Sequence, residues 1–172
     1  PMVFVRLQEC NVGCRWCDIK YTWGTGGDEL TVAQILHRIT AIQGDCTKVY
    51  ITGGEPLLRV LELGHLVDRL LHNGRYSVTI ATNGTLPKPV WWNRVRWDVD
   101  YKCPSSGVDT FDLSWKNTGQ KNCIKFVVAD KADLEFVERT LPQLQNPLCP
   151  TLLVSPAILP GRSFDKDKEW LQ

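Results

Sequence analysis

The sequence predicts an α/β fold, namely an open partial (βα) barrel with about six mainly parallel strands. Two observations support this prediction. Short apolar segments alternate along the chain with segments in which apolar residues recur at the helical period. Alternating units of this kind build parallel sheets through right-handed crossovers. Because six strands are fewer than the eight of a closed barrel, we expect the sheet to stay open.

Each expected element has a local signal. The expected strands, in chain order, are Val3–Leu7, Lys48–Thr52, Ser77–Thr82, Trp97–Tyr101, Cys123–Ala129 and Leu152–Val154. The expected helices are 31–43, with a capping box formed by Thr31 and Gln34, 57–73, 131–141, and one that begins at Asp165. Asp130 is expected to cap the helix at 131–141, and Pro142 to end it.

The composition fits one globular domain over residues 1–172. The chain has 20 basic and 19 acidic side chains, a balance that gives no electrostatic footprint for nucleic acid. It contains no long uncharged apolar run, so we expect no membrane span. Seven cysteines, three of them within eight residues, do not resemble a disulfide scaffold. Clustered thiols and no visible secretion signal predict a reducing, cytoplasmic location and a metal site.

The cysteine cluster predicts an iron–sulfur site. Cys10, Cys14 and Cys17 offer three thiolates from one loop, enough for three irons of a 4Fe–4S cubane. The fourth iron then has no protein ligand, which leaves a position open for a substrate. The alternatives are a zinc site or three ordinary cysteines. Zinc usually takes four ligands in paired knuckles, and the sequence has no second Cys-x2-Cys or His pair.

Polar and glycine-rich sequence motifs follow the expected strands at their carboxyl ends, where the functional residues of parallel α/β folds lie. The cysteine loop follows the first strand. The other words are Gly53-Gly54-Glu55-Pro56, Asn83-Gly84-Thr85, the stretch 102–107 and Ser155-Pro156. This placement predicts one functional edge of the sheet, because a chance distribution would scatter such words over both edges.

These words carry a family resemblance. Cys-x3-Cys-x2-Cys after a first strand, with Trp16 before the last cysteine, resembles the radical S-adenosylmethionine (SAM) superfamily. Gly53-Gly54-Glu55-Pro56 is similar to the glycine-rich SAM motif of that superfamily. Longer words resemble the 7-carboxy-7-deazaguanine synthase family from Val3 to about Pro156, and the word at 100–107, Asp-Tyr-Lys-Cys-Pro-Ser-Ser-Gly, is the most family-specific.

The resemblance implies a reaction and its partners. The family converts 6-carboxytetrahydropterin to 7-carboxy-7-deazaguanine with loss of ammonia, on the route to queuosine and related deazapurines. It does so through a 5′-deoxyadenosyl radical from SAM and a 4Fe–4S cluster. An electron donor such as flavodoxin and a homodimer are the corresponding expectations, with no nucleic acid and no membrane as partners.

The resemblance also implies roles for individual residues. Cys10, Cys14 and Cys17 match the cluster ligands. Residues that match SAM contacts are Trp16, Gly53, Gly54, Glu55, Asp100, Tyr101, Lys102 and Ser155. Arg6 and Thr52 match substrate contacts, and a guanidinium suits the pterin carboxylate because its fork bonds both oxygens. Arg6 as a solvated strand residue and Lys102 as a surface charge are the plainer alternatives.

Three departures from the family pattern stand out. Ile19 occupies the position of a threonine that helps to bind Mg²⁺, and it has no oxygen to offer a hard cation. Magnesium would then bind through Asp18, or through substrate and water, or the dependence is lost. The family's amino-terminal Gln-Gly-Glu-Gly segment and its usual carboxy-terminal segment are missing. We therefore expect a single radical SAM domain that lacks both segments.

Two other functions compete with the synthase. A radical SAM activase, which makes a glycyl radical on a partner protein, has a similar cysteine motif. It would need an exposed groove, whereas a pterin needs a small pocket, and the word at 100–107 favours the pterin. A non-catalytic metal-binding module would keep the cysteines but has no need for glycine-rich words at each strand end. Cleavage of SAM by the reconstituted protein separates the enzymes from the module.

Overall fold

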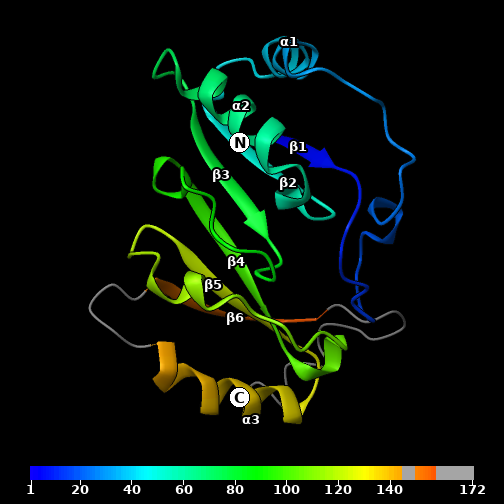
Figure 1. The fold of residues 1–172 in the computed structure, drawn as a ribbon, viewed down its shortest axis with the longest axis vertical. Helices are drawn as coiled ribbons and strands as arrows, with labels where there is room; N and C mark the ends of the chain where they lie inside the picture. The colour runs from blue at the N-terminus through cyan, green and yellow to red at the C-terminus, as the bar shows by residue number, and fades with distance from the viewer. Residues whose placement is uncertain (145–149, 158–172) are drawn as a thin grey trace. The chain divides into compact units, whose positions relative to one another are not determined.

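The computed structural model describes residues 1–144 and 150–157, which form an α/β fold around one open six-stranded sheet (Figure 1). The strands lie in chain order: β1 Val3–Leu7, β2 Lys48–Gly53, β3 Ser77–Thr82, β4 Arg96–Lys102, β5 Cys123–Val128 and β6 Thr151–Pro156. The pairs β1–β2, β2–β3 and β5–β6 are parallel. The prediction of an open α/β sheet with about six mainly parallel strands is confirmed. The helix expected to begin at Asp165 lies outside the described residues.

The described residues group into two compact units. The first comprises 1–11, 19–82 and 88–98, and the second comprises 12–18, 83–87 and the described part of 99–172. β4 contributes Arg96, Trp97 and Asp98 to the first unit and its remaining residues to the second. The single domain expected from the sequence stays a prediction.

The first unit contains β1 to β3 with helices α1 (Val32–Ile42) and α2 (Val60–Leu71), which pack against each other. Alternation along β2 buries Val49 and Ile51, and α2 adds the helical set Leu63, Leu66, Val67 and Leu70. The expected capping box of α1 is present, since Thr31 Oγ1 accepts from Gln34 N and the Gln34 side chain accepts from Thr31 N. Local sequence signals therefore explain this unit well.

The helix expected at 57–73 begins later than predicted. A short 3₁₀ turn, η2 (Pro56–Arg59), comes first, and α2 begins only at Val60. The cause is Glu55, whose carboxylate accepts a hydrogen bond from Leu57 N and caps the tight turn. The prediction of an unbroken helix from Leu57 was wrong because it counted only the apolar spacing.

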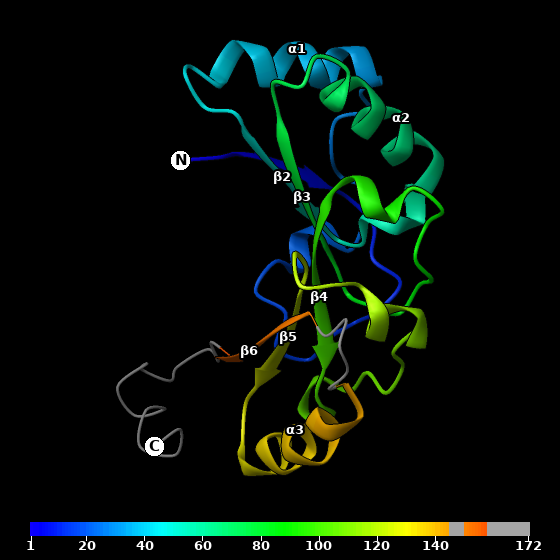
Figure 2. The same ribbon diagram turned by 90° about the vertical axis from the view of Figure 1, so that its left-hand side faces the viewer.

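The second unit contains β5, β6 and helix α3 (Lys131–Leu144), which packs against β5 and the short η4 turn, Pro104–Ser106 (Figure 2). Asp130 caps α3, as expected, by accepting from Asp133 N at 3.0 Å. The prediction that Pro142 ends the helix was wrong, because α3 continues to Leu144. Leu144 is fully buried, and burial of that side chain stabilises a last turn that proline alone would disfavour.

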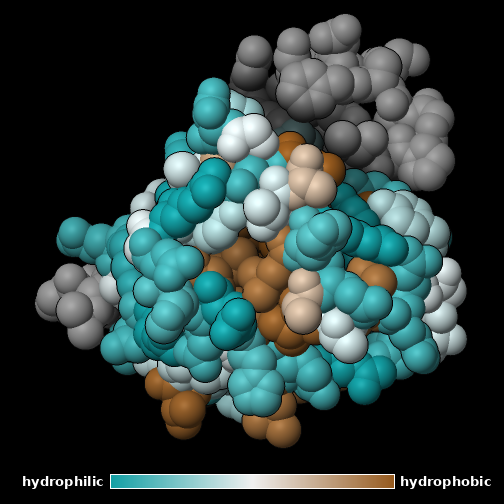
Figure 3. Space-filling model, turned by 90° about the horizontal axis from the view of Figure 1, so that it is seen from above, coloured by the Kyte–Doolittle hydropathy of each residue, from teal (hydrophilic) through white to brown (hydrophobic). Residues whose placement is uncertain are grey.

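The outer surface combines polar side chains with some exposed apolar ones. Ile42 at the end of α1 is 70% exposed, and Leu61 on α2 is 74% exposed. Seen from above, apolar residues reach the surface among hydrophilic ones (Figure 3). None of the helices within 1–144 combines the length and apolar character needed to cross a bilayer.

Candidate functional site

The predicted site residues divide between the two units. Arg6, Cys10, Thr52, Gly53, Gly54 and Glu55 belong to the first. Cys14, Trp16, Cys17, Asp100, Tyr101, Lys102 and Ser155 belong to the second. Within each unit they lie near the carboxyl ends of strands or in the loops that follow, as the sequence predicts for a parallel sheet.

The parallel register of β1 and β2 brings the two predicted substrate residues together. Arg6 pairs with Thr52 across the ladder, so the two side chains stand side by side on one face of the sheet. The Arg6 side chain is exposed and that of Thr52 is partly buried. Both are therefore accessible, at least in part, from this face of the sheet.

Gly53 and Gly54 let β2 pass very close to the chain that leaves β1. A Cβ on Gly53 would lie 2.1 Å from the carbonyl oxygen of Leu7, and one on Gly54 would lie 1.9 Å from that of Glu9. Gly54 N donates to Leu7 O at 3.0 Å, and Glu55 N donates to Glu9 O at 2.8 Å. Backbone packing therefore requires glycine at both positions. This requirement does not depend on any ligand that their carbonyl oxygens bind.

Gly54→Ala should lower the free energy of unfolding by about 3 kcal/mol, because its methyl group meets backbone that cannot rotate away. Gly26→Ala is the matched control, since a Cβ there has nothing within 4 Å. We expect the control to change stability by no more than about 0.5 kcal/mol. Urea denaturation of the full chain measures both variants, and equal stability would contradict the close approach.

Glu55 is buried beneath this loop, with 1% of its surface exposed. Its Oε1 accepts from Leu57 N and from Thr82 Oγ1, each at 2.9 Å. The carboxylate thus links the end of β2 to the end of β3. The family resemblance implies that Glu55 contacts SAM, and the structure adds a second role, the link between β2 and β3, which depends on Thr82.

In the second unit, the cysteine turn is bound to the loop that follows β4. Cys17 N donates to Cys14 O at 3.1 Å, which closes the turn. Arg15 N donates to Ser106 O at 2.9 Å, and Trp16 Nε1 donates to Ser105 Oγ at 2.9 Å. The cysteine turn, residues 14–17, is therefore hydrogen-bonded to the segment 100–107, whose sequence is the most family-specific.

A partly buried ion pair lies beside this turn. Lys102 Nζ lies 2.8 Å from Asp100 Oδ2, and Lys125 Nζ lies 3.0 Å from Asp100 Oδ1. The Lys102 side chain is only 9% exposed, and its Nζ lies 5.4 Å from the centre of the Trp16 ring. Lys102 is thus not the surface charge of the plainer alternative, but a buried cation in contact with the cysteine turn.

Opposing effects set the charges of this pair. Burial lowers the pKa of Lys102, but the charge of Asp100, followed by that of Cys14, outweighs it and raises the pKa above the usual 10.5. Burial likewise raises the pKa of Asp100, but Lys102 and then Lys125 bring it below the usual 3.8. Both groups are charged at neutral pH, so a fixed positive charge faces Cys14 and Cys17.

Tyr101 and Ser155 are placed differently from Lys102. The Tyr101 ring stacks on Phe111 at 3.9 Å between centroids and also on Phe126 at 5.1 Å. Alternation along β4 directs it to the face opposite Asp100 and Lys102. Ser155 lies on β6 opposite Val127. Because the Tyr101 ring is in this aromatic stack, we expect any contact of Tyr101 with SAM to involve its backbone.

Comparison with known proteins identifies the family. The model of the radical SAM superfamily matches residues 5–151. The 7-carboxy-7-deazaguanine synthase of Koribacter versatilis (strain Ellin345) is 36% identical over 165 residues, which cover 91% of this chain and 70% of the relative. The chain belongs to the 7-carboxy-7-deazaguanine synthase family of the radical SAM superfamily.

A further member of the family and a solved structure also match this chain. The 7-carboxy-7-deazaguanine synthase of Methanospirillum hungatei JF-1 is 32% identical over 156 residues, which cover 91% of this chain but 64% of that relative. The crystal structure of QueE from Escherichia coli matches with a TM-score of 0.75 at 24% identity, over 99% of this chain and 79% of that one. This last likeness concerns the fold. The chain spans about two thirds of the length of these curated relatives.

The thiols of this radical SAM chain have the chemistry that an iron–sulfur cluster requires. Cys10, Cys14 and Cys17 are not in disulfide bonds, and Lys102 offsets negative charge near the last two. Cys103 is different, because burial, and then Asp133, raise its pKa to about 12 and keep it a protonated thiol. Among the described residues, no three His, Cys, Asp or Glu side chains are already grouped as a metal site. The ligand set of this family member is therefore a proposal.

Sequence reasoning missed several residues that support the predicted site. Lys125 bonds Asp100, and Asp133 accepts from Ser105. Neither has a signal in the sequence: Lys125 lies within an apolar strand, and Asp133 resembles an ordinary acidic residue in the first turn of a helix. Their roles follow from which loops the fold brings together, and no local pattern encodes that.

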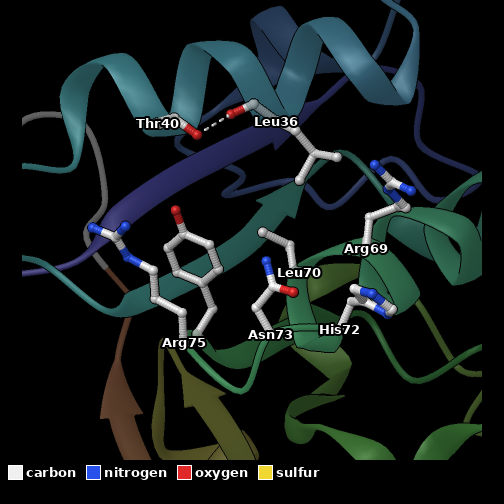
Figure 4. Close-up of a pocket in the computed structure, with 8 residues that line it drawn as sticks. Leu36, Thr40, Arg69, Leu70, His72, Asn73 and Arg75 are labelled. Atoms are coloured by element: carbon white, nitrogen blue, oxygen red, sulfur yellow. Dashed lines mark hydrogen bonds between the residues drawn. The ribbon is translucent and has the colours of Figure 1, made fainter.

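A pocket in the first unit holds none of the predicted site residues. Leu36 and Thr40 of α1 face Arg69 and Leu70 of α2, with His72, Asn73, Arg75 and Tyr76 completing the wall (Figure 4). Thr40 Oγ1 donates to Leu36 O at 2.9 Å, an ordinary bond within a helix. The two labelled arginines lie at opposite ends of the pocket and do not converge on a common point (Figure 4). We assign this pocket no part in the reaction.

Proposed function

We propose that this chain is a 7-carboxy-7-deazaguanine synthase, a lyase that converts 6-carboxytetrahydropterin to 7-carboxy-7-deazaguanine with loss of ammonia. One observation carries the proposal beyond family membership. The stretch at 103–107 binds the cysteine turn through Arg15 N and Trp16 Nε1. A reaction shared with the family would require the family-specific segment to contact the cysteine turn directly.

The proposed cofactors are a 4Fe–4S cluster held by Cys10, Cys14 and Cys17, and SAM. When bound, they supply the radical that takes the C6 hydrogen of the pterin. Lys102 places a positive charge beside Cys14 and Cys17, where the negative charge of a bound cluster and its ligands would lie. Trp16 offers a ring face to a nucleoside. Backbone carbonyls at Gly53 and Gly54 are suited to an ammonium group, which needs acceptors.

The proposed substrate contacts are Arg6 and Thr52, which are neighbours on the β1–β2 ladder. The exposed guanidinium can bond both oxygens of the pterin carboxylate, and the Thr52 hydroxyl can donate to or accept from the ring. Arg6→Ala should therefore raise KM for the pterin about tenfold or more, as expected when a charged hydrogen bond is lost. Cleavage of SAM in the absence of the pterin should be unchanged.

Arg139→Ala is the matched control, because Arg139 is an exposed arginine on α3. Both reactions should be measured for each variant, 5′-deoxyadenosine release for SAM cleavage and 7-carboxy-7-deazaguanine for the full reaction. Equal loss of the two activities in Arg6→Ala would contradict the substrate role of Arg6.

The finer expectations complete the proposal. The donor of the electron is a protein such as flavodoxin, the active form is a homodimer, and the enzyme works in the cytoplasm as one domain. Magnesium, if used, binds through Asp18 or through the substrate, because Ile19 offers no oxygen. Comparing turnover with and without added Mg²⁺ after chelation tests this last point.

The experiment that tests the function is turnover by the anaerobically reconstituted chain with SAM, a reductant and 6-carboxytetrahydropterin alone. The proposal predicts one 7-carboxy-7-deazaguanine per pterin consumed and release of ammonia. Cleavage of SAM without conversion of the pterin would favour the activase instead. A chain that binds metal but never cleaves SAM would be the non-catalytic module.

A further inference from the structure

Asp133 is a buried carboxylate that the proposed reaction does not use. It lies in the first turn of α3, with no exposed surface. It accepts hydrogen bonds from Ala129 N at 2.8 Å and from Ser105 N at 2.9 Å, and the Ser105 hydroxyl donates to its Oδ2. A buried carboxylate is costly unless several donors satisfy it, and here three donors do so.

The bond between Ser105 and Asp133 fixes the direction of the Ser105 hydroxyl. Because the Ser105 hydroxyl donates to Asp133 Oδ2, its single proton points toward Asp133. The lone pairs of the same oxygen then face away, where Trp16 Nε1 donates to it at 2.9 Å. Asp133, Ser105 and Trp16 thus form one directed chain of hydrogen bonds that ends on the indole.

The indole at the end of this chain is held from a second side. Lys102 Nζ lies 5.4 Å from the ring centre, and the backbone of the preceding residue, Arg15, donates to Ser106 O. The first contact comes from the last residue of β4 and the second from the turn that follows it, so the ring has little freedom to rotate. A ring fixed before its ligand arrives avoids the entropy cost of being ordered on binding.

We propose that Asp133 and Ser105 are positioning residues that preorganise Trp16, next to the cluster cysteines, as a binding surface for the nucleoside of SAM. This inference rests on the proposed function, because it assumes that Trp16 meets SAM. A purely structural role for Asp133, as an acid at the start of α3, predicts a different outcome. Removing the Ser105 hydroxyl leaves both backbone bonds to Asp133 in place, while Asp133 loses its side-chain donor and Trp16 Nε1 loses its acceptor.

The test is a titration of the reduced, reconstituted chain with SAM, followed by the change in the EPR signal of the cluster. Ser105→Ala should leave the SAM-free signal unchanged and raise the SAM concentration at half-change about fivefold, the effect of one net hydrogen bond. Ser105→Thr, which keeps the hydroxyl, should restore wild-type binding. Ser77→Ala removes an exposed hydroxyl at the start of β3 and should bind SAM as the wild type does.

A double-mutant cycle shows whether the effect passes through Trp16. Trp16→Phe removes the N–H donor, so adding Ser105→Ala to it should weaken SAM binding no further. If Ser105→Ala proves too unstable to reconstitute, Asp133→Asn should give the same fivefold shift, since an amide cannot accept from all three donors. Unchanged SAM binding in Ser105→Ala, or a further loss in the Trp16→Phe background, would overturn the inference.

The outcome is separable from that of the proposed function. Failure of the wild-type chain to convert the pterin would reject the synthase, but it would leave the SAM titration of the variants untouched. Normal pterin turnover with no shift in the titration would reject only the positioning role of Asp133 and Ser105.

Discussion

Cys14→Ala should abolish both the iron–sulfur cluster and the cleavage of SAM. Cys14 is buried in the turn that Arg15 and Trp16 bind to the loop after β4, so no other described thiol can take its place without moving that turn. Cys103 is not a substitute, since burial raises its pKa to about 12. We expect iron content and 5′-deoxyadenosine release to fall to background after anaerobic reconstitution.

Cys123→Ala is the control for this prediction, because Cys123 is a buried thiol at the start of β5 and belongs to no predicted site. It should cost about 1 kcal/mol of stability and keep the cluster. Iron and sulfide analysis, with the visible spectrum, decides between the variants. A Cys14→Ala chain that retained a full cluster would contradict the ligand assignment.

Lys102→Met should lower the free energy of unfolding by about 2 to 3 kcal/mol, since it removes a charged hydrogen bond of the partly buried Asp100 and leaves that carboxylate with Lys125 alone. The methionine keeps the length and most of the packing of lysine, so the loss reports charge. Lys131→Met, at an exposed lysine of α3, is the control and should change stability by no more than about 0.5 kcal/mol.

The pH dependence of this difference has a defined sign. The pKa of Lys102 is raised in the folded chain, so its stabilisation is complete below pH 10.5 and is lost as pH rises through the higher folded value. The pKa of Asp100 is lowered, so its stabilisation is present above pH 3.8 and is lost as pH falls through the lower folded value. Denaturation curves of wild type and variant should differ by a constant amount between these limits. A difference that shrank between neutral pH and 10.5 would contradict a charged pair.

The sequence predicts those parts of the fold that local chemistry determines. The bounds of β1 and β3 agree with the prediction, because alternating apolar residues and the turn that follows each strand define it locally. The capping box of α1 is likewise a local signal. The start of α2 was missed because the Glu55 carboxylate caps a tight turn through Leu57 N, and the end of α3 was missed because burial of Leu144 offsets the effect of Pro142.

The candidate site likewise combines residues that the sequence predicts with supporting residues that it does not. Spacing predicts that Cys14, Cys17 and Trp16 share one loop, and the family resemblance predicts Thr52 and Lys102 as site residues. The support for these residues lies elsewhere in the sequence: Thr82 bonds Glu55, Lys125 bonds Asp100, and Asp133 bonds Ser105. Contacts between residues so far apart in sequence depend on the register of the sheet and the docking of loops, which no short motif records.

The most direct test of the account asks whether one iron of a cubane is free to bind SAM. The chain is reconstituted anaerobically, analysed for iron and sulfide, reduced, and mixed with SAM that carries an isotope label on its amino nitrogen. The account predicts about four irons and four sulfides per chain, and a hyperfine coupling between the labelled nitrogen and the cluster. A chain with no cubane, or with one whose spectrum ignores SAM because protein ligands already fill every iron, would contradict it.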